Sequence, residues 1–204
     1  MKILLINPPH TSIGSRLPRE HLPPLGLLSV AGPLIDSGYE VELLDADFGN
    51  LSTATITREV MVRQPDAILM GHSGSTSAQP VINEIAQSVK GHRPEMTIIV
   101  GGVFPTFHWK EILEEHSAID VIVRGEGEQT ALDLIETLEQ DADLESVNGI
   151  AFRSDGEAVS TPAAEPIADL DAYRIAWELM GDRPYTYWGK KKAVVIQFSR
   201  GCPY

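Results

Sequence analysis

Two glycine-containing segments carry side chains that can contact a ligand. Residues 71–77 (GHSGSTS) follow the apolar run 67–70, and residues 101–106 (GGVFPT) follow the apolar run 97–100. Glycine lets a ligand approach the backbone, and serine and threonine hydroxyls can hydrogen-bond a planar polar group. We interpret both segments as binding loops, because open α/β sheets bind ligands at the carboxyl ends of their strands. Ordinary turn chemistry is the alternative for the first loop, and a helix-entry turn is the alternative for the second.

A third glycine-containing segment, residues 124–128 (RGEGE), follows the predicted strand 119–123. A phosphate loop would continue with Gly-Lys-Ser or Gly-Lys-Thr, and this segment does not. The sequence therefore gives no support for nucleotide triphosphate hydrolysis.

Histidines and aspartates follow the first two predicted strands. His10 and His21 belong to residues 8–23, a polar connection longer than the usual ~2 to 6 residues. They are either solvated loop residues or, in the case of His10, placed where a ligand approaches. Asp45 and Asp47 either hold a ribose hydroxyl, as a carboxylate after a second strand can, or end the strand and face water.

An alternation of strands and helices positions these loops. Residues 2–6 form a continuous apolar run, which is typical of a strand buried on both faces. Pro23 and Pro24 open a helix that Gly38 closes. We predict an α/β fold, a doubly wound Rossmann-like (flavodoxin-like) five-stranded parallel sheet. Its predicted strands are residues 2–6, 40–44, 67–70, 97–100 and 119–123, and the helices between and after them include 53–63, 81–89 and 130–138.

The pattern changes after Asp141. Residues 149–161 predict a β-hairpin with an Asp-Gly turn, followed by a linker, a short amphipathic helix over 169–180 and an apolar strand over 193–198. We divide the chain into an α/β domain (1–145), a region of hairpin, linker and helix (146–191) and the start of a further domain (192–204).

Composition limits the partners and the location. The 204 residues carry a net charge of −13, which argues against a nucleic-acid partner. The apolar N-terminal run is too short for a signal peptide or a membrane span. A single cysteine, Cys202, fits a reducing compartment, so we expect a cytoplasmic protein without a membrane span.

Taken together, the sequence resembles the cobalamin-binding class of radical S-adenosylmethionine (SAM) enzymes. The resemblance covers the whole chain and rests on the α/β domain with its loops, GGVFPT, RGEGE, and a final strand that ends in Ser-Arg-Gly-Cys-Pro. Residues 7–10 (NPPH), 21–27 (HLPPLGL) and 44–48 (LDADF) make it most similar to the anaerobic oxidative cyclases that act on magnesium-protoporphyrin IX monomethyl ester.

This resemblance implies cobalamin, a 4Fe–4S cluster and SAM as cofactors. In the class, three cysteines of a Cys-x3-Cys-x2-Cys loop bind the cluster, and Cys202 matches the first of them. The chain stops two residues later, so we expect it to be the N-terminal part of a larger enzyme and to be inactive alone. The implied cobalamin contacts are His10, Ser73, Gly74, Ser75, Thr76, Ser77, Gly101, Gly102, Val103, Gly125, Glu126 and Gly127.

One motif of related cobalamin domains is not matched. Methyl-transfer and mutase domains place a cobalt-binding histidine in Asp-x-His-x-x-Gly, whereas residues 7–10 and Gly14 stand in that place in this sequence. The sequence therefore does not identify the lower ligand of the cobalt, and two alternatives remain: an open lower face, or a lower face held by a group other than His10.

For the full-length enzyme the resemblance implies closure of the isocyclic ring of (bacterio)chlorophyll. Its partners would be the magnesium-porphyrin substrate and an electron donor protein. Two alternatives stay open: a cobalamin-dependent radical methyltransferase with another substrate, and a stand-alone module that binds a nucleotide-like ligand without catalysis.

Overall fold

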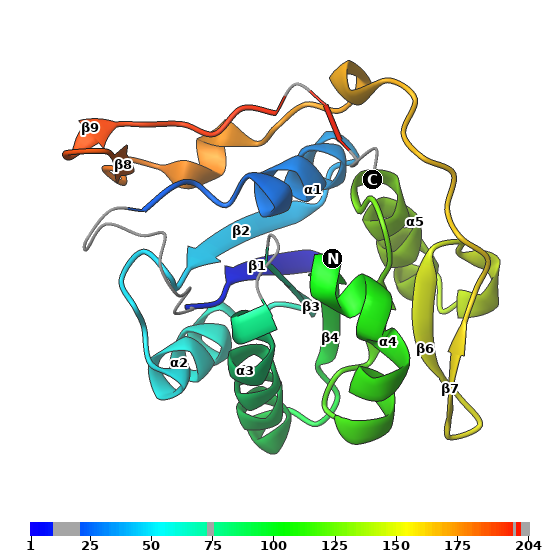
Figure 1. Cartoon of the computed structure of the whole chain (residues 1–204). Helices are drawn as coiled ribbons and strands as arrows, with labels where there is room; N and C mark the ends of the chain where they lie inside the picture. The colour runs from blue at the N-terminus through cyan, green and yellow to red at the C-terminus, as the bar shows by residue number, and fades with distance from the viewer. Residues whose placement is uncertain (10–20, 73–75, 198, 201–204) are drawn as a thin grey trace.

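The computed structural model describes residues 1–9, 21–72, 76–197 and 199–200. In this part of the chain, seven strands form one sheet in the order β2-β1-β3-β4-β5-β6-β7 (Figure 1). The first five are parallel, and β6 and β7 continue the sheet in antiparallel pairing. The order 2-1-3-4-5 is that of flavodoxin-like folds, which confirms the predicted parallel core.

The boundaries of the elements agree closely with the sequence pattern. The sheet strands are β1 (Lys2–Asn7), β2 (Glu40–Asp45), β3 (Ala67–His72), β4 (Thr97–Gly102), β5 (Val121–Val123), β6 (Ile150–Ser154) and β7 (Glu157–Ser160). The α-helices are α1 (Leu25–Asp36), α2 (Thr53–Arg63), α3 (Gln79–His92), α4 (Val103–Glu115) and α5 (Glu128–Glu139). Short 3₁₀ turns are η1 (Thr76–Ala78), η2 (Leu144–Ser146), η3 (Leu170–Ala172) and η4 (Trp177–Met180), and a small hairpin pairs β8 (Thr186–Tyr187) with β9 (Lys191–Lys192).

Helices cover both faces of the sheet, as Figure 1 shows. Ile3 and Leu5 of β1 pack with α1 and α5, whereas Leu4 and Ile6 pack with α2, α3 and α4. All four side chains are fully buried. A continuous apolar run is therefore required in β1, because successive side chains point to opposite faces and both faces are core.

Glycine conformations explain two chain reversals. Gly38, which follows α1, has φ +89°, in the left-handed region that glycine adopts without strain. In the predicted Asp-Gly turn, Asp155 and Gly156 have φ +51° and +86°, the pattern of the two-residue turns that match strand twist. The hairpin β6–β7 is thus confirmed, and its first strand is hydrogen-bonded to β5.

Two predictions for the C-terminal region are wrong. Residues 169–180 form the separate turns η3 and η4 instead of one helix. The Asp169 carboxylate accepts a hydrogen bond from the Asp171 amide at 3.0 Å, which closes a turn that competes with helix. In addition, the Ala176 amide donates to the Leu28 carbonyl of α1 at 3.0 Å. This amide therefore does not form the hydrogen bond to the carbonyl four residues earlier that a helix over 169–180 would need.

Residues 193–197 are not a strand either. An apolar segment becomes a strand only when a neighbour accepts and donates its backbone hydrogen bonds, and within the described residues no strand pairs with it.

The predicted division at residues 145/146 falls just before the hairpin, which shares the sheet with the first five strands. Among the described residues, no helix combines the length and apolar composition that a membrane crossing requires.

Two valines on α2 offer a matched test of this packing. Val60 is fully buried and Val62 is 72% exposed. We expect Val60→Ala to lower the free energy of unfolding by about 2 kcal/mol, from lost burial of two methyl groups and the cavity left behind. Val62→Ala should change it by less than about 0.5 kcal/mol. Urea denaturation measures both, and equal effects would contradict the assigned faces of α2.

Candidate functional site

A cavity of about 680 Å³ opens at the carboxyl ends of β1, β3, β4 and β5. Its other walls are the start of α1, the 125–128 segment and residues 195–197. This is the edge at which parallel α/β sheets bind ligands, and the volume lies within the ~300–1,000 Å³ of small-molecule pockets.

Two glycines form the floor of the cavity. Gly71 of β3 and Gly101 of β4 are paired in register and both line it. A Cβ atom at Gly71 would lie 3.3 Å from the Leu27 side chain, closer than ordinary contact. Glycine at 71 thus leaves room for Leu27, and both glycines expose backbone to the cavity, which suits close approach of a bulky ligand.

The segment predicted as a loop over 101–106 is a direct junction of strand and helix. Gly101 and Gly102 end β4, and α4 begins at Val103. Gly102 has φ +114°, a conformation that L side chains rarely adopt, so the backbone itself favours glycine at this position. Val103 is 56% exposed and lines the cavity.

The Thr106 hydroxyl joins two sides of the opening. It donates to the Gly102 carbonyl at 2.8 Å and accepts from the Gly125 amide at 3.0 Å. This side chain holds the 125–128 segment beside the end of β4.

Glu126 and Glu128, the two glutamates of the RGEGE segment, bind residues of the C-terminal part of the chain. Arg200 donates from Nη1 to Glu128 Oε2 at 3.0 Å and from Nη2 to Glu128 Oε1, and its Nη1 lies 3.4 Å from Glu126 Oε1. Glu126 Oε2 accepts from the Ile167 amide at 2.6 Å. The Glu128 side chain is only 5% exposed, and its hydrogen bonds raise the pKa of Arg200. Such a two-pronged pair is geometrically specific, so it fixes the C-terminal segment (residues 193–197 and 199–200) at the cavity.

The aspartate at the end of β2 is buried rather than solvated. Asp45 is 6% exposed. Its Oδ1 accepts from Asn7 Nδ2 at 2.7 Å and from the Phe48 amide at 3.3 Å, and its Oδ2 accepts from the Tyr185 hydroxyl at 2.6 Å. Burial, together with the hydrogen bond to Asp45, raises the pKa of Tyr185, so its hydroxyl stays a donor.

Asp47 is also buried, and His21 beside it is half-buried. His21 Nδ1 lies 3.5 Å from Asp47 Oδ2, and Asp47 is 6% exposed. The His21 ring packs on the Phe48 ring with a centroid distance of 5.3 Å. The backbone carbonyl of His21 accepts a hydrogen bond from the Thr186 amide at 3.1 Å. The alternative in which Asp45 and Asp47 face water is therefore wrong, whereas 22% of the His21 side chain stays exposed.

The predicted ligand contacts fall into three groups. Gly101, Gly102, Val103 and residues 125–127 all line the cavity. Ser77 is exposed in η1 and is not part of the lining. His10, Ser73, Gly74, Ser75 and Cys202 lie outside the described residues, as does the side chain of Thr76.

The contributors to the cavity that sequence reasoning missed include Asn7, residues 22–27, residues 195–197 and Arg200. Asn7 had a usable signal, since it is the first polar residue after a buried strand. Residues 195–197 had none, because nothing in an apolar run shows that it will cross a distant cavity.

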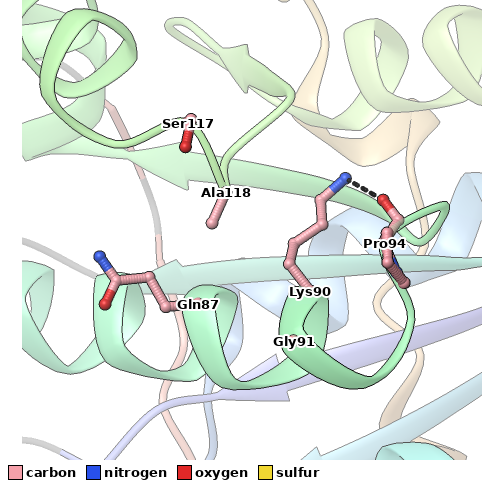
Figure 2. A pocket seen from close by; sticks show the side chains of 6 residues that line it. All are labelled: Gln87, Lys90, Gly91, Pro94, Ser117 and Ala118. Carbon is pink, nitrogen blue, oxygen red and sulfur yellow. Dashed lines mark hydrogen bonds between the residues drawn. The ribbon is translucent and has the colours of Figure 1, made fainter.

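A second, smaller hollow of about 430 Å³ lies at the opposite end of the sheet, between α3 and the chain leading into β4 and β5. Figure 2 shows Lys90 there, donating to the Pro94 carbonyl at 3.2 Å. Lys90 also pairs with Asp120 at 2.9 Å, so its charge is neutralised. Within the described ranges, no group of three or more His, Cys, Asp or Glu side chains is arranged to hold a metal ion.

The anchor on Arg200 gives a prediction for Glu128→Gln. Loss of the charged partner should speed cleavage within residues 193–197 by elastase, which cuts after small apolar residues, roughly tenfold, the equivalent of about 1.4 kcal/mol for a charge-assisted hydrogen bond. Limited proteolysis followed by mass spectrometry measures this. Glu114→Gln on α4, whose side chain is 54% exposed, is the control and should leave the cleavage rate unchanged. An unchanged cleavage rate in Glu128→Gln would show that the pair does not hold the segment.

Comparison with known proteins agrees with this architecture. Over all its 204 residues the chain is 52% identical to the anaerobic magnesium-protoporphyrin IX monomethyl ester cyclase of Synechocystis sp. (strain ATCC 27184 / PCC 6803 / Kazusa), and it spans 41% of that protein. It is 30% identical to the hopanoid C-3 methylase of Methylococcus capsulatus (strain ATCC 33009 / NCIMB 11132 / Bath), covering 100% of this chain and 38% of the methylase. The chain thus spans about two fifths of the length of these relatives.

Solved structures share the fold. The radical SAM methyltransferase TsrM from Kitasatospora setae, with cobalamin and a [4Fe-4S] cluster bound, matches 86% of this chain and 31% of its own at a TM-score of 0.66 and 20% identity. The cobalamin-dependent radical enzyme OxsB, with aqua-cobalamin and SAM bound, matches 81% of this chain and 22% of its own at 0.65 and 24%. The family model of the B12 binding domain matches residues 18–135. The chain therefore belongs to the B12-binding domain family.

Proposed function

We propose that this chain is the cobalamin-binding N-terminal part of a radical SAM enzyme, the oxygen-independent cyclase that forms the isocyclic ring from magnesium-protoporphyrin IX monomethyl ester. The observation that carries the proposal is the 52% identity to such a cyclase along the whole chain. The substrate, the ring closure and an electron donor protein as partner belong to the whole enzyme. The single cysteine supports a location in the reducing cytoplasm.

The residues around the cavity fit cobalamin. The paired Gly71 and Gly101 expose backbone to a bulky ligand, and apolar side chains such as Leu25 and Val30 supply the remaining surface. When bound, cobalamin supplies a redox-active cobalt ion held in a corrin ring. The proposed contacts are Gly101, Gly102, Val103 and residues 125–127, together with His10 and residues 73–77 on sequence grounds.

The anchoring of Arg200 supports the proposed role of Cys202 as the first cluster ligand. Arg200 is bound to Glu128 at the cavity wall, and Cys202 follows two residues later. Thiolates bind iron in 4Fe–4S clusters, and SAM uses the iron that lacks a protein ligand in the proposed enzyme. We propose residues 1–145 as the cobalamin domain, 146–191 as the connection and 192–204 as the start of the radical SAM domain.

A radical methyltransferase is the second candidate, and the similarity to the hopanoid C-3 methylase favours it specifically. The two candidates share this domain and differ downstream. Incubation of the full-length protein with magnesium-protoporphyrin IX monomethyl ester, SAM and reductant under anoxia separates them. Ring closure without added methyl carbon supports the cyclase, and an unconsumed ester contradicts it. A stand-alone binding module is excluded if the reading frame continues with cysteines four and seven residues after Cys202.

Cobalamin binding can be tested on these residues alone. Anaerobic titration with hydroxocobalamin should change its visible absorbance, and the pigment should elute with the protein on gel filtration. Gly101→Leu should abolish retention, because the side chain fills the floor of the cavity while a Cβ there makes only ordinary contacts of 3.6 Å or more. Gly102→Leu is a poorer test, since φ +114° adds backbone strain.

The matched control is Gly91→Leu on α3, where a Cβ atom meets nothing within 4 Å. This variant should retain the pigment like the unmodified chain. Absence of any pigment retention by the unmodified chain would overturn the proposal of cobalamin binding, and retention by Gly101→Leu would place the ligand elsewhere.

A further inference from the structure

Asn7 is a polar side chain on the otherwise largely apolar inner wall of the cavity. It ends β1, is 7% exposed and lines the cavity. Its backbone carbonyl already accepts from the Ala46 amide at 3.0 Å and from the Asp47 amide at 3.2 Å. The side-chain amide is therefore the part of Asn7 that a ligand can use.

The orientation of this amide is fixed by chemistry. An ionised carboxylate only accepts hydrogen bonds, so Asn7 must turn its NH₂ group toward Asp45, where Nδ2 lies 2.7 Å from Oδ1. Among the described residues, no donor is hydrogen-bonded to Asn7 Oδ1. The side chain thus offers the cavity an acceptor and withholds its donor.

The groups behind Asn7 hold that arrangement in place. Asp45 is also bound by the Tyr185 hydroxyl at 2.6 Å, and Tyr185 is 3% exposed. The Asp45 carboxylate thus accepts hydrogen bonds from three protein donors and needs no water. Turning the Asn7 amide over would place its oxygen against this carboxylate, so the observed orientation is favoured. The negative charge of Asp45 directly behind the amide adds repulsion against an anionic ligand group at this point.

We propose that Asn7 is a specificity-determining residue whose Oδ1 accepts a hydrogen bond from a carboxamide N–H at the rim of the ligand and rejects a carboxylate in the same place. The proposal rests on the proposed cobalamin function, because the corrin ring carries primary amide side chains along its rim. A ligand carboxylate in the same place would put its oxygens against Asn7 Oδ1, another acceptor, beside the buried charge of Asp45. The site would therefore weaken binding of the acid in addition to stabilising the amide.

The test compares hydroxocobalamin with its monocarboxylic derivatives, in each of which one rim amide is hydrolysed to the acid. For the unmodified chain we expect one derivative to bind at least tenfold more weakly than the parent at pH 7, measured by absorbance titration. In Asn7→Leu this discrimination should fall to about threefold or less, the remainder coming from the charge of Asp45, and the parent should bind about tenfold more weakly than before, since a ligand donor is left unpaired. The readout is thus a change in ligand preference, which a general loss of structure would not produce.

Asp45→Asn is the second variant. An asparagine at 45 can donate as well as accept, so Asn7 becomes free to present its NH₂ group, and the disfavoured derivative should bind more tightly relative to the parent. Asn83→Leu on α3, outside the cavity, is the matched control and should keep the discrimination. Equal binding of all derivatives by the unmodified chain, or undiminished discrimination in Asn7→Leu, would overturn the proposal. Failure of the unmodified chain to bind the parent would instead overturn the cobalamin function itself.

Discussion

Burial of both faces of the parallel sheet is the constraint on which the other features depend. Apolar side chains fill both sides of β1, β3 and β4, and helices cover them. Polar groups and open space are therefore confined to the ends of the strands, where backbone leaves the core. At the carboxyl ends, the pairing of Gly71 with Gly101 removes two side chains from neighbouring strands. The cavity lies at the strand ends because side chains and helices fill the space over both faces of the sheet.

Several hydrogen bonds attach the residues after the hairpin to the α/β core, and three of them are central to the arrangement described above. Ala176 is hydrogen-bonded to α1, Tyr185 to Asp45, and Arg200 to Glu128. At the first attachment, the Arg174 carbonyl would lie 1.9 Å from a Cβ at Gly32, so only glycine allows so close a crossing of α1. The chain that leads to Cys202 is thus fixed in part by α1 and the 125–128 segment, which also form walls of the cavity.

The acidic residues of the site act mainly within the protein. Glu126 and Glu128 bind Ile167 and Arg200, and Asp45 binds Asn7 and Tyr185. Buried carboxylates are costly unless donors satisfy them, which these contacts do. The proposed ligand surface is then built from glycine backbone, apolar side chains and the amides of Asn7 and Gln197, a composition suited to a large ligand with neutral polar groups at its rim.

The sequence by itself determined the parallel core, the hairpin and the glycines at the strand ends, because these depend on local periodicity and on backbone conformations that few residues adopt. Only the tertiary structure decided that Asp45 and Asp47 are buried, that Glu128 anchors Arg200, and that residues 195–197 line the cavity instead of forming a strand. Each of these depends on contacts between residues far apart in the chain, such as Asp45 with Tyr185. Neither residue type nor spacing encodes such a partner, because the free energy of burying a polar side chain is set by what the fold brings next to it.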